Sequence, residues 1–282
     1  MSELSPHESG PAEAPAIVFL HGVGNTGAMW RTHMASLPEY HCLAPDLPGF
    51  GRSQGEPWRT RAATAGLVAS LIESRALAGR AHVVGLSLGA SVAFELLRRR
   101  PELVDRVIID GCAAIPTAAA LPMKAGVAVL SPFLRWAWVA RLVGRAFGVK
   151  DGPNLADFVS QMTQASPGSF RRAFAQAQDV RITLELLHAE SPTLLVAGEH
   201  ELKSTRASNR LLAALLPHAV SRMVPDAGHG WISTAPDLHL RMVRAWLAHQ
   251  PLPAELRTED VELADAPVST ALGRPTHEET LR

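Results

Sequence analysis

The sequence predicts an α/β fold, in which a mostly parallel central sheet carries helices on both faces. Three observations favour this class. Short runs rich in branched aliphatic residues recur along the chain and have the composition of strands buried on both faces. Stretches of helical length, flanked by Gly, Pro or capping residues, lie between them. This alternation of strands and helices implies right-handed crossovers between parallel strands.

The expected elements follow one another from residue 17 to residue 249. The strands share short apolar runs, at 17–20, 42–44, 82–85, 107–110, 193–197 and 222–224. The helices share helical length and flanking breaker or capping residues, at 26–36, 59–77, 88–100, 205–215 and 235–249. We therefore expect one α/β core made of residues 16–111 and 191–250.

Three segments lie outside this core. Residues 112–190 are rich in Ala, Leu, Phe and Trp at helical spacing, and we expect them to form a helical cap, or lid, over the sheet. The N-terminal residues 1–15 and the C-terminal residues 251–282 show little periodicity, so both are expected to be mobile.

The expected cap has one alternative interpretation. The sequence of this segment has Phe133, Trp136 and Trp138 among Arg135 and Arg141, and this pattern also fits a helix lying on a membrane surface. A lid packed over the sheet explains the same pattern, and we favour the lid.

Composition excludes several classes of protein. Among the 282 residues, 27 Lys and Arg balance 27 Asp and Glu, so the formal net charge is zero and no nucleic-acid partner is expected. With 47% hydrophobic residues the chain can bury one large core. Cys42 and Cys112 are too few for a disulfide framework and lack the spacing of metal ligands. We expect neither a metal nor an organic cofactor.

No targeting or membrane-spanning signal is recognised. Residues 1–15 carry acidic residues and histidines without the apolar stretch of a secretory signal. The longest apolar stretch, 125–144, is broken by Pro132, Arg135 and Arg141, whereas a membrane span needs about 20 apolar residues. We expect a cytoplasmic protein without stable membrane insertion. Its oligomeric state stays open, and a homodimer is one option.

The strongest chemical signal is a G-x-S-x-G motif centred on Ser87, between Gly85 and Gly89. An expected strand precedes it and an expected helix follows it, which is the context of a nucleophile elbow. The sharp turn holds the serine in a strained conformation, and the glycines are needed because side chains there would clash with neighbouring backbone. The helix that follows directs its N-terminal N–H groups toward developing negative charge.

A serine hydroxyl needs a base to become a nucleophile. We choose His229, because it follows the last expected strand and lies in a turn just before the last expected helix. The acid that orients the histidine is harder to assign. Glu201 lies in the loop after strand 193–197, whereas Asp110 ends strand 107–110 and has the same chain order. Glu201 is our choice and Asp110 its rival.

The loop after the first expected strand begins His21-Gly22-Val23. The N–H groups of Val23 and Leu88 are expected to face the same oxygen and form an oxyanion hole. His21 is interpreted as bracing this loop. The turn cluster at 46–53 is interpreted as a structural loop.

These motifs together resemble the α/β-hydrolase superfamily in its compact, lidded form. The resemblance covers residues 16–249 and rests on the following motifs: strand-HG at 21–22, D-x-P-G-x-G-x-S at 46–53, G-x-S-x-G at 85–89, G-E-x-E at 198–201 and G-H at 228–229. It implies a helical cap inserted after the sixth strand. It also implies a carboxylesterase-like enzyme with Ser87 as nucleophile, His229 as base, Glu201 as acid, and the oxyanion hole at Val23 and Leu88. Glu201 departs from the family, which usually has Asp there.

A different enzyme class also has some support. The run Gly22-Val23-Gly24-Asn25-Thr26-Gly27 matches the G-x-G-x-x-G fingerprint of dinucleotide-binding proteins, and Asp46 follows a second expected strand. We favour the hydrolase, because a dinucleotide-binding unit gives no reason for the elbow or for the late histidine.

The expected activity is hydrolysis of a small, hydrophobic carboxylic ester through an acyl-enzyme. Trp30, Trp136 and Trp231 are the expected lining of an apolar substrate pocket. Two alternatives stay open. One is C–C bond hydrolysis or a cofactor-free elimination on the same triad, and the other is a ligand-binding protein of the same fold that does not turn over its ligand.

Overall fold

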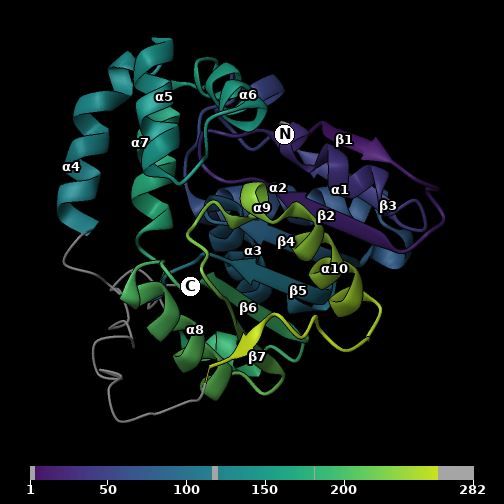
Figure 1. The fold of residues 1–282 in the computed structure, drawn as a ribbon. Coiled ribbons are helices and arrows are strands. Elements are labelled where there is room, and N and C mark those ends of the chain that lie inside the picture. Colours follow the sequence, from purple (N-terminus) through teal and green to yellow (C-terminus); the bar gives the residue numbers. More distant parts are fainter. Residues whose placement is uncertain (1–3, 116–119, 181, 260–282) are drawn as a thin grey trace, which may run out of the picture.

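The computed structural model describes residues 4–115, 120–180 and 182–259 (Figure 1). An eight-stranded sheet lies at its centre, in the spatial order β1-β3-β2-β4-β5-β6-β7-β8. The strands are β1 Pro6–Ser9, β2 Ala16–Leu20, β3 His41–Pro45, β4 Ala81–Leu86, β5 Val104–Asp110, β6 Thr193–Gly198, β7 Ala219–Val224 and β8 Arg257–Thr258. The six inner strands run parallel, and the outer β1 and β8 pair antiparallel. The predicted fold class is confirmed, and all six expected strands are present.

Helices cover both faces of the sheet. They are α1 Arg31–Ala35, α2 Arg61–Arg75, α3 Leu88–Arg99, α8 Lys203–Leu215, α9 Trp231–Thr234 and α10 Pro236–Leu247. Helices α1 and α10 bury Met34, Met242 and Trp246 against one face. Helices α2, α3 and α8 bury their apolar residues against the other face. Strands such as β2 and β3 are buried at every position, as expected for strands between two helical layers.

A helical insertion, residues 120–188, separates β5 from β6. It comprises α4 Ala120–Leu130, α5 Ala137–Ala146, α6 Pro153–Met162 and α7 Pro167–Ala177, with short 3-10 helices at Ser131–Phe133 and Leu184–His188. The insertion follows the fifth strand of the chain, so the expectation that it follows the sixth is wrong. Prolines 153 and 167 stand at the first positions of α6 and α7, where a missing N–H is tolerated.

The two ends of the core are more ordered than expected. Residues 6–9 form β1 and pair with β3, and residues 257–258 form β8 and pair with β7. Leu256 is buried in the core. Expecting mobility throughout 1–15 and 251–282 was therefore wrong for these residues. A short strand at a sheet edge needs only backbone pairing, so it leaves little hydrophobic periodicity in the sequence. Residues 1–3 and 260–282 lie outside the described residues.

The strand order of the sheet reverses at β2. Strand β2 lies between β3 and β4, so the connection after β2 leads to one side of β2 and the connection after β3 leads to the other side of β2. Ligands of open α/β sheets bind at such a switch point, beyond the carboxyl ends of the strands. Here the loops after β2 and β4 carry Gly22 and Ser87, respectively.

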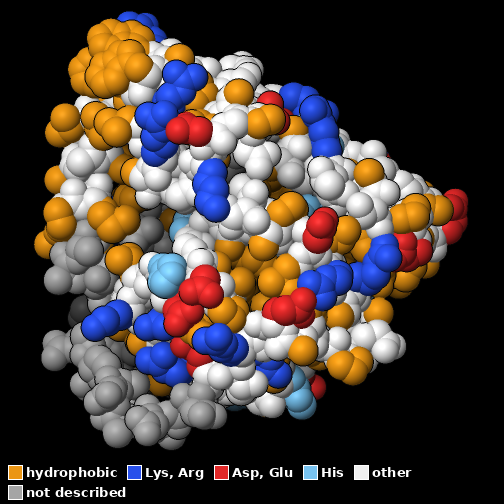
Figure 2. All heavy atoms as spheres, viewed as in Figure 1, with side chains coloured by type: hydrophobic (Ala, Val, Ile, Leu, Met, Phe, Trp, Pro, Cys, Tyr) orange, Lys and Arg blue, Asp and Glu red, His pale blue; other side chains and the backbone are white. Residues whose placement is uncertain are grey.

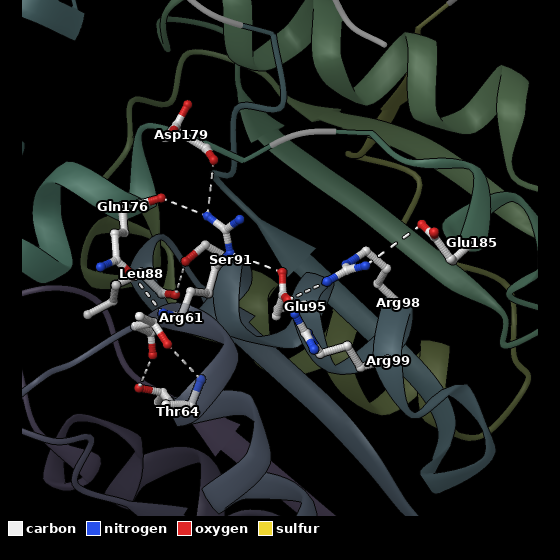
Figure 3. A network of polar contacts seen from close by, with 12 residues as sticks. Arg61, Thr64, Leu88, Ser91, Glu95, Arg98, Arg99, Gln176, Asp179 and Glu185 are labelled. Carbon is white, nitrogen blue, oxygen red and sulfur yellow. Dashed lines mark hydrogen bonds and ion pairs between the residues drawn. The ribbon is translucent and has the colours of Figure 1, made fainter. Parts of the chain in front are cut away.

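Figure 3 shows a polar network that fastens the end of α7 to the core. Arg61 of α2 lies 3.4 Å from Glu95 of α3 and donates to the carbonyl oxygens of Gln176 and Asp179, at 2.8 and 3.2 Å. Glu95 also pairs with Arg98 and Arg99. Burial is the largest single influence and favours the neutral acid, but the hydrogen bonds from Arg98 and Arg99 and the charges of Arg98 and Arg61 together outweigh it and lower the pKa of Glu95 to about 2. These contacts connect the end of α7 in the insertion to α2 and α3 of the core, and the buried charged groups have hydrogen-bond partners.

Two further properties follow from the described residues. Cys42 and Cys112 are buried free thiols. None of the helices in the described ranges combines the length and the apolar character that crossing a bilayer requires.

Candidate active site

Ser87 occupies the turn between β4 and α3. Its backbone has φ of 56° and ψ of −108°, a strained conformation for a residue with a side chain. Its N–H donates to the carbonyl oxygen of Asp110, at 2.8 Å, which ties the turn to the end of β5. A Cβ at Gly85 would lie 2.6 Å from the Gly89 oxygen, and one at Gly89 would lie 2.1 Å from the Leu20 oxygen. Both positions therefore require glycine.

His229 and Glu201 come together from different loops. His229 lies between β7 and α9, and Glu201 lies just after β6. Nδ1 of His229 is 3.1 Å from Oε2 of Glu201. The other carboxylate oxygen, Oε1, accepts the N–H of Gly198 at 3.2 Å. The Glu201 side chain is only 4% exposed, whereas that of His229 is 35% exposed. The acid is buried beneath the imidazole, and the imidazole reaches the surface of the site.

The charges around His229 stabilise its protonated form. Desolvation favours the neutral ring and lowers its pKa, but the charge of Glu201, its hydrogen bond and the charge of Asp110 outweigh desolvation and raise the pKa above the ordinary value of 6.5. A histidine held in this way is a stronger proton acceptor than a free imidazole, and its Nδ1–H is fixed toward the carboxylate.

Gly111 lies against this pair and was not predicted from the sequence. Its φ is +68°, and an added Cβ would lie 2.7 Å from Cε1 and 2.9 Å from Nδ1 of His229. Because Ser87 donates to Asp110, the residue just before Gly111, the elbow and the imidazole meet at the same end of β5. A glycine directly after a strand, where ligand-binding loops begin, is the signal that could have identified it.

Asp110, the rival acid, points elsewhere. Its Oδ1 accepts the indole N–H of Trp231 at 3.1 Å, and its Oδ2 lies 3.6 Å from Nε2 of His239. Burial, followed by the charge of Glu201, raises the pKa of Asp110 to about 8. His239 in turn contacts His33 at 2.8 Å, and burial lowers the pKa of each ring to about 3. Of the two candidate carboxylates, Glu201 is the one that contacts His229 Nδ1.

The loop after β2 lies beside the elbow. An added Cβ at Gly22 would lie 3.7 Å from the Cβ of Ser87. His21 is fully buried, with Nδ1 2.8 Å from the Gly22 oxygen, and its Nε2 accepts the N–H of Leu47 at 2.9 Å. Burial lowers the pKa of His21 to about 4, so the ring is neutral and links two loops. Val23 and Leu88, which carry the expected oxyanion-hole N–H groups, are both buried.

The carboxylate of Asp46 binds backbone N–H groups of nearby loops. Its two carboxylate oxygens accept the N–H groups of Gly27, at 2.7 Å, and Arg52, at 2.8 Å. A Cβ at Gly27 would lie 2.1 Å from the Ala44 oxygen, so this glycine allows two chain segments to approach each other. The glycine-rich run therefore has a structural explanation that needs no dinucleotide.

The helical insertion packs onto the loop that carries Val23. A Cβ at Gly24 would lie 2.4 Å from the Met162 methyl group and 3.4 Å from Phe158. Gln161 accepts hydrogen bonds from the N–H and the hydroxyl of Thr26, at 2.8 and 3.0 Å. Apolar side chains of α6 thus lie next to the candidate site. This contact joins residues far apart in the chain, which is why the sequence did not reveal it.

The three tryptophans expected to line a pocket lie in two different environments. Trp30 and Trp231 are fully buried in the core on the α1 and α10 face, and the ring of Trp30 packs 5.0 Å from that of Phe19. Trp136 is 44% exposed on the insertion and packs beside Phe133 and Trp138. These positions contradict the expectation that the three side chains line one pocket. The sequence could not show this, because aromatic content does not tell which face a side chain occupies.

No grouping of three or more His, Cys, Asp or Glu side chains suited to a metal ion occurs within the described ranges. The organised polar groups at this edge of the sheet are Ser87, His229, Glu201 and the backbone around Gly22. A hydroxyl, an imidazole, a carboxylate and backbone N–H groups are the kinds of group that can activate a nucleophile and hold an oxyanion.

The known proteins that this chain resembles include proteins described as hydrolases or esterases. The model of the alpha/beta hydrolase family matches residues 17–241. A Pseudomonas syringae protein whose name describes it as a carbamate hydrolase, RutD, is 29% identical over 87% of this chain and 98% of its own. The carboxylesterase YbfK of Bacillus subtilis is 26% identical over 78% of this chain and 76% of its own. A thermophilic esterase from Thermogutta terrifontis superposes with a TM-score of 0.72 at 24% identity, covering 87% of this chain and 93% of that one, which supports the fold alone.

Proposed function

Because this chain belongs to the alpha/beta hydrolase family and is an α/β-hydrolase enzyme, we propose that it hydrolyses small, hydrophobic carboxylic esters through an acyl-enzyme. Ser87 is the nucleophile, His229 the general base and Glu201 the acid that orients it. The observation that carries this proposal is the 3.1 Å hydrogen bond between His229 Nδ1 and Glu201 Oε2 at the end of the sheet that presents Ser87.

In the first half-reaction, the Ser87 oxygen attacks the carbonyl carbon of the ester while Nε2 of His229 takes the hydroxyl proton. The carbonyl oxygen becomes an oxyanion and accepts hydrogen bonds from the N–H groups of Val23 and Leu88. When the intermediate collapses, the bond to the alcohol breaks and His229 returns its proton to the departing alkoxide. Glu201 stays ionised and stabilises the imidazolium formed between these two events.

In the second half-reaction, water takes the place of the alcohol. His229 accepts a proton from the water as its oxygen attacks the acyl carbon, and the same N–H groups hold the second oxyanion. Collapse breaks the bond to Ser87 Oγ, which recovers its proton from His229. The products are a carboxylic acid and an alcohol, and the enzyme is regenerated without a cofactor.

The helical insertion acts as the cap of this site. Met162 and Phe158 lie over Gly24, next to the N–H of Val23, and so give the site an apolar wall. An apolar wall favours substrates with a hydrocarbon acyl or alcohol group over charged ones. The resemblance to RutD adds carbamates as a second class of acyl compound to test.

The proposal is tested with a series of p-nitrophenyl esters of increasing acyl length, together with a p-nitrophenyl carbamate. We expect turnover by the wild type, and a loss in kcat/KM of at least about 1,000-fold in Ser87→Ala. The matched control is Ser70→Ala, which removes an exposed hydroxyl from α2. Turnover by Ser87→Ala at the wild-type rate would overturn the proposal. Binding of an ester without turnover by a folded wild type would favour the ligand-binding alternative.

A further inference from the structure

Helix α4 is apolar apart from one lysine, and within the described part of the chain only one of its sides is covered. In its sequence, ALPMKAGVAVL, the sole charged residue is Lys124. Met123, Val127 and Leu130 are spaced along one side and pack against the core. Leu121, Ala125 and Val129 are spaced by four residues along another side and are exposed, Leu121 and Val129 by 78% and 68%. An amphipathic helix of a globular protein carries polar residues on that side, so this stripe has no partner among the described residues.

The exposed apolar surface continues beyond α4. Eight large hydrophobic side chains are exposed in the described ranges, and six of them belong to this part of the insertion: Leu121, Val129, Phe133, Trp136, Trp138 and Leu142. We call these six residues the apolar patch. Figure 2 shows hydrophobic side chains gathered along the edge of the molecule formed by α4 and α5. Scattered apolar residues are normal on a surface, but a concentration of this kind indicates an interaction site.

Aromatic residues form the centre of the patch. The rings of Phe133 and Trp136 lie 5.2 Å apart, and those of Trp136 and Trp138 lie 6.2 Å apart. Trp138 and Leu142 are one helical turn apart on α5, so they share a face, and they are 62% and 52% exposed. Exposed indoles beside aliphatic side chains are typical of the boundary between hydrocarbon and lipid headgroups.

The chain segment that carries the patch has only basic charged residues. Between Asp110 and Asp151 the chain has Lys124, Arg135, Arg141, Arg145 and Lys150 and no acidic residue, although the whole chain is neutral. Arg145 pairs with Asp151. Arg135 and Arg141 are exposed beside the aromatic residues, and neither is paired with a carboxylate in the described part of the chain. An anionic surface would complement this charge.

From these observations we infer that the apolar patch docks the enzyme onto an anionic lipid surface. Leu121, Val129, Trp138 and Leu142 enter the headgroup and upper acyl region, while Arg135 and Arg141 contact lipid phosphates. The helices lie in the plane of the surface and do not span it. The outward stripe of α4 offers only hydrocarbon, and the basic residues beside it favour an anionic lipid surface as the occupant of the patch.

The docking is tested with purified full-length protein and two kinds of extruded vesicle, one of phosphatidylcholine and one of phosphatidylcholine mixed with phosphatidylglycerol. We expect co-sedimentation with the mixed vesicles, weakened by added salt, and a blue shift of tryptophan emission. Because each basic residue near an anionic surface contributes about fivefold to binding, Arg135→Glu/Arg141→Glu should reduce partitioning more than about tenfold. Trp138→Ala/Leu142→Ala should reduce it by a similar factor.

Matched controls separate docking from general surface effects. Leu77→Ala/Leu202→Ala removes the two other large hydrophobic side chains that are exposed in the described ranges, and Arg31→Glu/Arg257→Glu reverses two exposed charges on the core. Both controls should bind vesicles like the wild type. All four double variants should turn over a soluble short-chain ester like the wild type. Ser87→Ala should lack this turnover but still bind vesicles, so docking and catalysis are tested independently.

Three results would overturn the inference. The first is a wild type that does not bind the mixed vesicles, and the second is a Trp138→Ala/Leu142→Ala variant that binds them like the controls. The third is a concentration-dependent dimer in sedimentation velocity that this variant abolishes while vesicle binding is absent, because a second copy would then be the occupant of the patch.

Discussion

Glu201 and His229 are joined by a hydrogen bond of 3.1 Å between Oε2 and Nδ1, although 28 positions separate them in the chain. The bond occupies Nδ1, so in the proposed reaction Nε2 of the imidazole is the nitrogen that exchanges protons with substrate and nucleophile. Asp110, the other carboxylate near this ring, is held by Trp231 instead. The pair therefore distinguishes two acids that the sequence left as rivals.

The first prediction compares these two acids. Glu201→Gln should lower kcat/KM by up to about 10⁴-fold, because the amide cannot stabilise an imidazolium and permits the wrong tautomer. Asp110→Asn keeps an oxygen that can accept the Trp231 indole N–H, so its loss should be much smaller. Steady-state kinetics on one ester measures both. A larger loss in Asp110→Asn would show that Asp110 is the acid.

The second prediction concerns the pH dependence of the reaction. The base must be neutral to accept a proton, so kcat/KM should rise with pH through the pKa of His229, which is raised above 6.5. Glu201→Gln removes the largest factor that raises this pKa, and the acid limb should move to lower pH. A profile of kcat/KM from acid to neutral pH measures the shift. An unchanged limb would mean that Glu201 does not control His229.

The third prediction tests the contact of Gly111 with the imidazole. Gly111→Ala places a Cβ 2.7 Å from Cε1 of His229 and puts a side chain at φ of +68°. We expect kcat/KM to fall at least about tenfold, since displacing a catalytic group by about 1 Å has a large effect on rate. Gly66→Ala on α2 is the control, because nothing lies within 4 Å of its added Cβ. Equal activity of the two variants would contradict the assigned contact.

The fourth prediction concerns stability and pH. The pKa of Asp110 is about 8 in the folded protein and 3.8 ordinarily. Between these values the folded state keeps a proton that the unfolded state releases, so this residue lowers the free energy of unfolding as pH rises from about 4 to about 8. Asp110→Asn removes this dependence, and its Tm relative to wild type should increase from pH 5 to pH 8.

Calorimetry across this range measures the Tm difference, where each 1 kcal/mol corresponds to about 2–4 °C for a chain of this size. His33 and His239 titrate in both proteins, so their contribution cancels in the comparison. A Tm difference that does not vary with pH would show that Asp110 is ionised in the folded protein throughout.

The sequence predicted the parts of this molecule that depend on local pattern. The inner strands follow from short apolar runs, and the strained turn at Ser87 follows from Gly85 and Gly89, whose Cβ atoms would clash with backbone. The loop of Glu201 follows from its position after a buried strand. Each of these signals lies within a few residues of the feature that it predicts.

The features that the sequence did not reveal depend on contacts between distant segments. Gly111 is recognisable only once His229 is placed against it, and Gln161 only once α6 meets Thr26. The edge strand β1 needs nothing but backbone pairing with β3. Trp136 could have faced inward or outward, since helical spacing fixes a face without saying what covers it.

The most direct test of the central claim, that Ser87 is an activated nucleophile, is intact-mass spectrometry after exposure to a fluorophosphonate. We predict one adduct on the folded wild type, located on Ser87 by peptide mapping, and none on Ser87→Ala or on urea-unfolded wild type. His229→Ala should label far more slowly, because no base would take the hydroxyl proton. An adduct that persists in Ser87→Ala, or a folded wild type that stays unlabelled, would contradict the claim.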